Sequence, residues 1–148
     1  MKALLQRVAE AAVSVDGREV GRIGPGLLVF LGLDRGDDLA VAERLLSRVL
    51  RYRVFADDAG RMNRSVVDSG GGVLLVSQFT LSADTGRGLR PSFSSALPPA
   101  EAEALYGECL AWLRSQHAPV AAGEFGADMQ VSLVNDGPVT FLLESLAP

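Results

Sequence analysis

The sequence predicts a single-domain α/β protein with a mixed, largely antiparallel β-sheet and two main helices. Three observations lead to this fold class. The chain has 148 residues, which is close to the usual size of one domain. Short apolar runs separated by glycine-rich turns are typical of strands, whereas two longer segments repeat apolar residues at helical spacing. No linker rich in proline or serine separates two such sets, so we expect residues 1–148 to form one domain.

The first half of the chain is expected to contain one helix among several strands. Asp38 offers an N-cap, and apolar residues recur at helical spacing from Leu39 onwards, which predicts an amphipathic helix over residues 37–51. The strand before this helix is continuously apolar, as expected for a buried central strand. The strands are predicted at residues 1–8, 12–15, 20–23, 27–31 and, after the helix, 52–55.

The second half repeats this pattern with longer connections. Three glycines precede an apolar strand predicted over residues 73–79, and residues 82–97 form the longest loop. A second helix is expected to begin at Pro98. Two final strands are predicted at residues 129–134 and 139–144, on either side of the segment Asn135–Asp136–Gly137–Pro138.

Composition and charge exclude several classes of protein. With 48% hydrophobic and 22% charged residues, the chain is globular rather than disordered. Its longest apolar run, residues 27–33, is shorter than the roughly 18 to 20 residues of a membrane span. Gln6 and Arg7 lie where a secretory signal would need apolar residues. A net charge of −4 argues against broad nonspecific nucleic-acid binding. We therefore expect a cytoplasmic protein that has neither a membrane nor DNA as a partner.

The chain has one cysteine and one histidine, and these two residues limit its chemistry. A zinc site of the cysteine/histidine type needs three or four such ligands, so no metal is expected. His117 lies at the end of the second predicted helix, where a solvated surface histidine is expected, and this argues against a histidine-based catalytic triad. Cys109 lies on the apolar stripe of the same helix and is interpreted as a packing residue. No glycine-rich segment matches a nucleotide-binding motif, so no cofactor is expected.

Two polar segments are candidates for a functional site. The strand ending in Ser77, Gln78, Phe79 and Thr80 either emerges into solvent in the ordinary way or places backbone N–H groups at a site for a developing oxyanion. The segment 135–138 fits a hairpin turn. A cis Gly137–Pro138 bond is the alternative, but only about 5 to 6% of such bonds in folded proteins are cis.

A third candidate is a stripe of arginines. Arg44, Arg48 and Arg51 share one face of the first predicted helix, at spacings of four and three residues. Such a stripe is either a solvated face or a contact for phosphates, which arginine binds in a bidentate manner.

Several motifs, spread over almost the whole chain, resemble the D-aminoacyl-tRNA deacylases of the common bacterial and eukaryotic type. They are Leu5–Gln6–Arg7–Val8, Arg61–Met62–Asn63, Ser77–Gln78–Phe79–Thr80–Leu81, Arg90–Pro91–Ser92–Phe93, Met129–Gln130–Val131 and Asn135–Asp136–Gly137–Pro138–Val139–Thr140. Two long motifs in the same order make the resemblance specific.

The resemblance implies an enzyme that hydrolyses the ester between a D-amino acid, or to some extent glycine, and the terminal ribose of tRNA. It implies a homodimer in which a cis Gly137–Pro138 enters the partner's pocket, and Arg7 helps to fix that segment. The residues assigned to catalysis are Ser77, Gln78, Phe79 and Thr80, and those assigned to substrate binding and chiral selection are Gly137, Pro138, Arg7, Met129 and Asn135. Arg44, Arg48 and Arg51 are then candidates for contacts with tRNA phosphates.

Two other functions remain open from the residues. One is a noncatalytic oligomer that binds a small molecule at the end of the strand. The other is a conventional hydrolase in which Thr80 is the nucleophile, although no base is evident that could activate its hydroxyl.

Overall fold

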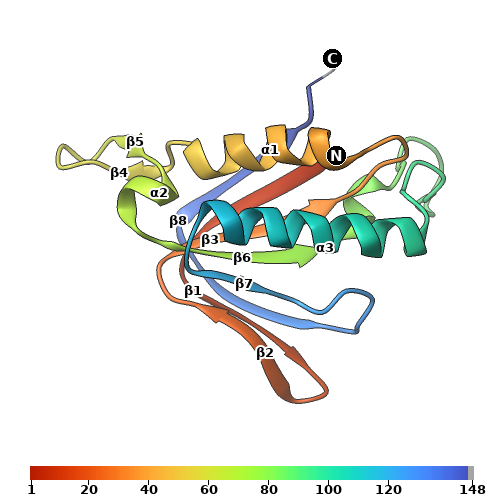
Figure 1. Cartoon of the computed structure of the whole chain (residues 1–148), viewed down its shortest axis with the longest axis horizontal. Coiled ribbons are helices and arrows are strands. Elements are labelled where there is room, and N and C mark those ends of the chain that lie inside the picture. The colour runs from red at the N-terminus through yellow and green to blue at the C-terminus, as the bar shows by residue number, and fades with distance from the viewer. Residues whose placement is uncertain (147–148) are drawn as a thin grey trace.

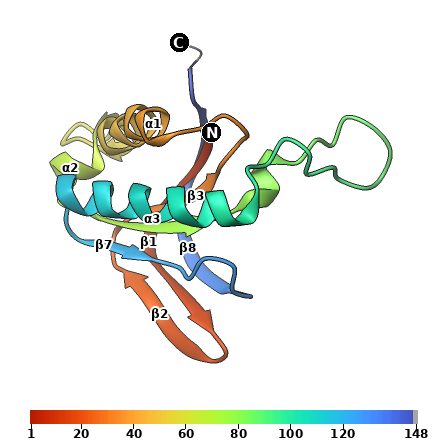
Figure 2. The same ribbon diagram turned by 45° about the vertical axis from the view of Figure 1, so that its right-hand side comes forward.

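The protein is an α/β domain in which two long helices cover one face of a curved sheet (Figures 1 and 2). The computed structural model describes residues 1–146. The six-stranded sheet has the order β2–β1–β3–β6–β7, and β8 also pairs with β1. Its strands are β1 (Lys2–Val15), β2 (Arg18–Ile23), β3 (Gly26–Gly32), β6 (Gly72–Ser77), β7 (Val120–Ala122) and β8 (Gln130–Glu144). The long helices are α1 (Leu39–Arg51) and α3 (Pro99–Gln116), as the sequence predicts.

Small elements complete the chain. A two-stranded hairpin follows α1 and precedes a short helix, and a 3₁₀ helix follows β6. These elements are β4 (Phe55–Ala56), β5 (Met62–Arg64), α2 (Val66–Ser69) and η1 (Phe79–Ser82). Within residues 1–146, no helix is both long and apolar enough to cross a lipid bilayer.

The sheet is mixed and mostly antiparallel, which confirms the predicted fold class. β1 is antiparallel to β2, β3 and β8, whereas β3–β6 and β6–β7 are parallel. Gly26 and Gly72, which begin the two central strands, lie side by side in register. A Cβ atom on Gly26 would collide with the carbonyl oxygen of Gly72, so glycine is required where these strands start.

Helix α1 is stabilised by an N-cap at its start and by an apolar face that packs on the sheet. The Asp38 carboxylate accepts a hydrogen bond from the backbone N–H of Val41 at 2.9 Å. The helix begins at Leu39, two residues later than predicted, because Asp38 has the extended backbone of a cap. Its buried face is Ala42, Leu45, Leu46, Val49 and Leu50.

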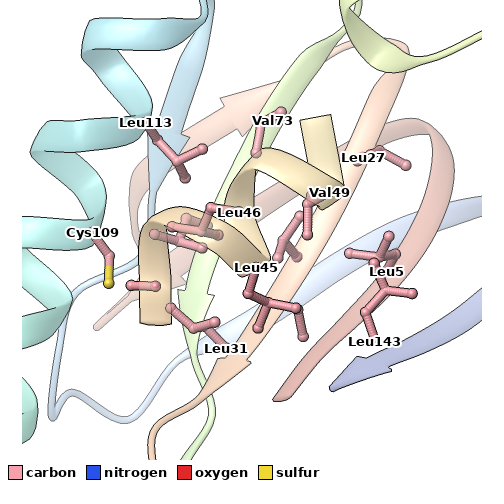
Figure 3. Packing of buried hydrophobic residues seen from close by; sticks show 14 of the residues in the cluster. Leu5, Leu27, Leu31, Leu45, Leu46, Val49, Val73, Cys109, Leu113 and Leu143 are labelled. Carbon is pink, nitrogen blue, oxygen red and sulfur yellow. The ribbon is translucent and has the colours of Figure 1, made fainter. Parts of the chain in front are cut away.

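The main core lies between the two helices and the sheet (Figure 3). Leu45 and Leu46 of α1 and Leu113 of α3 pack over strand residues such as Leu31. Cys109 is completely buried in this cluster, and burial raises the pKa of its thiol to about 12. Its complete burial in the core confirms the interpretation of Cys109 as a packing residue.

Four predicted strands have different boundaries in the structure. Residues 129–134 and 139–144 do not form a hairpin, because both segments belong to the single strand β8 and pair with β1. The strand predicted at residues 52–55 is displaced to Phe55–Ala56. The strand predicted to reach residue 79 ends at Ser77, where the chain turns into η1.

Candidate active site

A pocket lies where β3 and β6 end. Its volume is ≈ 670 Å³, and its walls come from four parts of the chain: the ends of the two central strands, the loop before α3, the first turn of α3 and the segment before β8. The lining residues are Leu31, Leu33, Arg35, Val76, Ser77, Gln78, Phe79, Phe93, Ala96, Leu97, Pro98, Pro99, Ala102, Phe125, Gly126, Ala127, Met129 and Val131. Most of these side chains are apolar, as in other pockets for small molecules.

Three of the four residues assigned to catalysis line this pocket. The backbone N–H of Gln78 donates to the carbonyl oxygen of Leu31 at 2.8 Å, which is the last bond between the two central strands. Phe79 then begins η1, so its N–H and that of Thr80 have no acceptor within the short helix. Ser77, Gln78 and Phe79 lie in the wall, whereas Thr80 is exposed outside it and accepts a hydrogen bond from the side-chain amide of Gln78.

An aromatic pair forms part of the wall. The ring centroids of Phe79 and Phe93 are 5.0 Å apart, and the two residues are 61% and 40% exposed. Phe93 comes from the long loop between η1 and α3, which extends away from the body of the molecule (Figure 2). The guanidinium of Arg35 donates to the carbonyl oxygen of Ser94 at 2.7 Å and fixes the base of this loop. Sequence reasoning selected the loop by its length and missed Phe93, Arg35 and Phe125 as individual wall residues.

The segment Asp136–Val139 forms a wide bulge in β8. Gln6 of β1 faces Thr140 and Val8 faces Asn135, so four residues of β8 lie opposite Arg7 alone. Gly137 and Pro138 are exposed, and the peptide bond between them is cis, as the resemblance implies. Arg7 therefore lies directly opposite the bulge, where its side chain can stabilise it.

Side chains on both strands fix this bulge. The Asn135 side chain accepts from the N–H of Val139 at 3.1 Å and donates to the Thr140 hydroxyl at 2.9 Å. The Arg7 Nε atom donates to the carbonyl oxygen of Asp136 at 3.1 Å, and its Nη1 atom donates to that of Val54 at 2.7 Å. The contact between Arg7 and the 135–138 segment thus agrees with the role that the resemblance implies.

The pocket and the bulge lie at different ends of the sheet within one chain. Arg7 is opposite Leu27 at the beginning of β3, whereas the pocket begins at Leu31. Four residues of strand span about 13 Å. Met129 lines the pocket, but Arg7, Asn135, Gly137 and Pro138 do not. Within a single subunit, four of the five residues assigned to substrate binding and chiral selection are therefore separated from the pocket, and Met129 alone lies in its wall.

The arginine stripe lines a second groove of ≈ 540 Å³ between α1, Trp112, Ser145 and Leu146. Arg44, Arg48 and Arg51 all border this groove. The Arg48 guanidinium donates to the carbonyl oxygen of Glu144 at 2.8 Å. The three arginines thus share one surface, which does not include the pocket.

Titratable groups are scarce around the pocket. Among the described residues that line it, Arg35 is the one ionisable side chain. His117 is half-buried instead of fully solvated, because its Nε2 atom lies 2.7 Å from the carbonyl oxygen of Gly71. Over residues 1–146, no three histidine, cysteine, aspartate or glutamate side chains are grouped as metal ligands would be.

The chain resembles known proteins over nearly its whole length. The sequence model of the family described as D-Tyr-tRNA(Tyr) deacylase matches residues 4–144. Proteins named D-aminoacyl-tRNA deacylase from Stutzerimonas stutzeri and Azotobacter vinelandii are 65% and 63% identical to it, and each match covers 98% of this chain and 100% of the relative.

Two solved structures have the same fold. One, titled c-Myc DNA Unwinding Element Binding Protein, is 42% identical with a TM-score of 0.95 and covers 99% of this chain and 100% of its own. The other, titled as a structural analysis of a probable eukaryotic D-amino acid tRNA deacylase, has a TM-score of 0.78 at 18% identity, over 96% of this chain and 97% of its own. From the family match and the identity to the curated relatives, the chain belongs to the D-Tyr-tRNA(Tyr) deacylase family.

Proposed function

We propose that the protein hydrolyses the ester bond of D-aminoacyl-tRNA and releases free tRNA and the D-amino acid, a form of chiral proofreading. Membership of the family supports this function. The observation that carries it is the pocket at the end of β6, which places Ser77, Gln78 and Phe79 beside a largely apolar cavity of ≈ 670 Å³. That cavity suits an aminoacyl group attached to a ribose.

The chemistry is that of a labile ester held in position. Water attacks the carbonyl carbon, the bond to the ribose oxygen breaks, and that oxygen leaves with a proton. The N–H groups of Phe79 and Thr80 are the proposed donors to the developing oxyanion, and the 2′-hydroxyl of the substrate is close enough to the ester to assist. Thr80 acts through its backbone, because its hydroxyl lies outside the pocket wall and the described residues of that wall include no carboxylate or imidazole to activate it.

Chiral selection requires a second subunit in this proposal. The bulge with Gly137 and Pro138 is exposed and distant from the pocket of its own chain, so it reaches a pocket only in a partner. There it forms a wall where the side chain of an L-amino acid would project, and Arg7 and Asn135 hold it in place. We propose that the protein is a homodimer, and that it acts in the cytoplasm, where aminoacyl-tRNA is used.

One solved relative is named for binding DNA, and DNA binding is therefore a second candidate function. Because the protein has a net charge of −4, broad electrostatic binding to duplex DNA is disfavoured, whereas a local contact between a few arginines and tRNA is not. A competition assay separates the two functions. We expect an excess of duplex DNA to leave deacylation unchanged, whereas DNA that competes with tRNA would favour the second candidate.

The proposal is tested by blocking the pocket. Ala127 lies in the wall and is partly exposed, so Ala127→Trp fills the cavity with little effect on the core. Ala104→Trp, on the exposed face of α3, is the matched control. We expect the native protein and the control to deacylate D-aminoacyl-tRNA and the pocket variant to be inactive. A native protein that leaves this ester intact would support the noncatalytic binding function instead.

A further inference from the structure

Six of the thirteen arginines of the chain lie in one short stretch of sequence. Residues 43–64 contain six arginines and three acidic residues, although the whole chain has a net charge of −4. We call these six the basic surface: Arg44, Arg48 and Arg51 on α1, Arg53 after it, and Arg61 and Arg64 at β5. Of these side chains, Arg64 forms an ion pair, with Asp58, and most of the positive charge faces solvent.

This surface follows the second half of β8 and ends at the bulge. Three contacts mark its course. Arg48 donates to the carbonyl oxygen of Glu144, and the Tyr52 ring lies 6.0 Å from that of Phe141. Val54 is joined to Asp136 through Arg7, at 2.7 and 3.1 Å. Figure 1 shows the β4–β5 hairpin beside the carboxyl end of α1, where β8 bends. The end of the basic surface at Arg53, which precedes Val54, is therefore held near Gly137 and Pro138, and Arg48 lies further along β8 at Glu144.

The pocket of the same chain lies at the opposite end of α1. The backbone of Asp34 forms an isolated antiparallel β-bridge with that of Ala96, which lies in the pocket wall. The N–H of Arg35 donates to the carbonyl oxygen of Ser95 at 2.9 Å. Acidic residues come just before this end of the helix, namely Asp34, Asp37 and the cap Asp38. A helix of 13 residues is about 20 Å long, so the basic surface begins within α1 and runs away from its own pocket.

We infer that a tRNA whose aminoacyl end occupies the pocket of one subunit lies with its acceptor-stem phosphates on the basic surface of the other subunit. The inference rests on the proposed function, in which the bulge of the second subunit closes the first subunit's pocket. The subunit that supplies Gly137 and Pro138 also supplies the basic surface that ends near them. Arginine suits this contact, because its planar guanidinium binds phosphate in a bidentate manner.

A mixed dimer with one working pocket tests which subunit binds the tRNA. One subunit carries Ala127→Trp, so that only its partner is active, and the two subunits carry different affinity tags for purification. The double substitution Arg51→Gln/Arg53→Gln is placed either on the blocked subunit or on the active one. Arg18→Gln/Arg114→Gln is the control, because it removes the same charge from exposed arginines elsewhere.

We expect the double substitution to act only from the blocked subunit. There it lowers kcat/KM for D-aminoacyl-tRNA about tenfold, since two charge-assisted contacts are lost at a screened surface. It also reduces the slope of log affinity against log salt by roughly 1.4 to 1.8, because each of the two phosphate contacts contributes about 0.7 to 0.9. On the active subunit, it changes kcat/KM and the salt slope no more than the control does.

The inference is contradicted if the double substitution lowers activity from any other combination of subunits. A loss of activity from the active subunit alone assigns the phosphates to the subunit that holds the pocket. Equal losses from both placements, or no loss from either, remove the specific link between the basic surface and the partner's pocket. If Ala127→Trp prevents folding, Met129→Trp blocks the same wall, and if the double variant does not fold, Arg53→Gln alone carries the test.

A substrate without phosphates separates this inference from the proposed function. D-aminoacyl-adenosine contains the ester and the ribose but no acceptor stem. We expect the native enzyme and the Arg51→Gln/Arg53→Gln homodimer to hydrolyse it equally well. If the native enzyme hydrolyses neither this ester nor D-aminoacyl-tRNA, the proposed function fails. If both esters are hydrolysed and the mixed dimers show no asymmetry, only the present inference fails.

Discussion

Gly137 occupies a backbone position that a side chain would disturb. Its φ is +138°, in a region that favours glycine. A Cβ atom there would lie 2.6 Å from Cγ2 of Val139 and 3.3 Å from the Arg7 guanidinium. The neighbouring Asn135 fixes the other side of the bulge through Val139. The conformation of this segment therefore depends on the absence of a side chain at residue 137.

The first prediction concerns this glycine. Gly137→Ala shifts the bulge and moves the proposed wall, so L-aminoacyl-tRNA gains access and the D-to-L ratio of kcat/KM falls by roughly tenfold or more. The fold is retained, because the bulge lies at the surface. Gly107→Ala is the control, since a Cβ there meets open space on α3. A Gly137→Ala enzyme with unchanged selectivity would remove the bulge from chiral selection.

A second prediction concerns Thr80. Its hydroxyl accepts a hydrogen bond from Gln78 and lies outside the pocket wall, so Thr80→Ala leaves the backbone donors in place. We expect kcat to change by less than about tenfold, because tenfold corresponds to about 1.4 kcal/mol, the free energy of one modest contact. Single-turnover deacylation measures this directly. Loss of all turnover in a folded Thr80→Ala protein, together with a trapped acyl-enzyme in the native one, would identify Thr80 as the nucleophile.

At the scale of elements, the sequence predicted both long helices and most strands, because those signals are local. The apolar spacing of α1 and its cap Asp38 lie within one segment. The prediction of a hairpin at the end of the chain was wrong, and for a different reason. Asn–Asp–Gly–Pro has the composition of a turn, but here it forms a bulge that depends on Arg7 and Gln6, more than 100 residues earlier. Local composition does not distinguish a turn from a bulge that is held by a distant strand.

The prediction at this scale tests the cap of α1. Asp38→Ala leaves the N–H of Val41 without its side-chain acceptor and destabilises the protein by about 1 kcal/mol. The midpoint of urea unfolding should decrease with no change in the slope. Asp128→Ala, at an exposed residue outside the helices, is expected to have no such effect. An equal stability for both variants would show that packing alone fixes the start of α1.

At the scale of the whole molecule, the sequence selected the two parts of the site but not their arrangement. Ser77 and its neighbours were found because polar residues end an apolar strand. The wall residues Phe93 and Phe125 were missed, because they come from segments that are distant in sequence and unremarkable in composition. The separation of Gly137 from the pocket becomes visible only through the register of the sheet.

A further prediction follows from selection by exclusion. Glycine has a hydrogen on both sides of its α-carbon, so the wall that we propose for Gly137 and Pro138 meets no side chain to exclude. We expect glycyl-tRNA to be hydrolysed measurably. Missing apolar contacts reduce activity only about 10- to 200-fold per methylene, which does not make the ester inert. Complete stability of glycyl-tRNA, at enzyme concentrations that clear a D-aminoacyl-tRNA, would mean that the pocket instead grips the D side chain.

The most direct measurement compares one tRNA charged with the D and the L form of the same amino acid. Both esters have the same intrinsic reactivity and the same phosphates, so only the arrangement around the α-carbon differs. We expect the native protein to release the D-amino acid in proportion to enzyme concentration and to leave the L ester at its spontaneous rate of hydrolysis. Equal rates for the two esters, or no enzymatic hydrolysis of either, would contradict a chiral site closed by the partner's bulge.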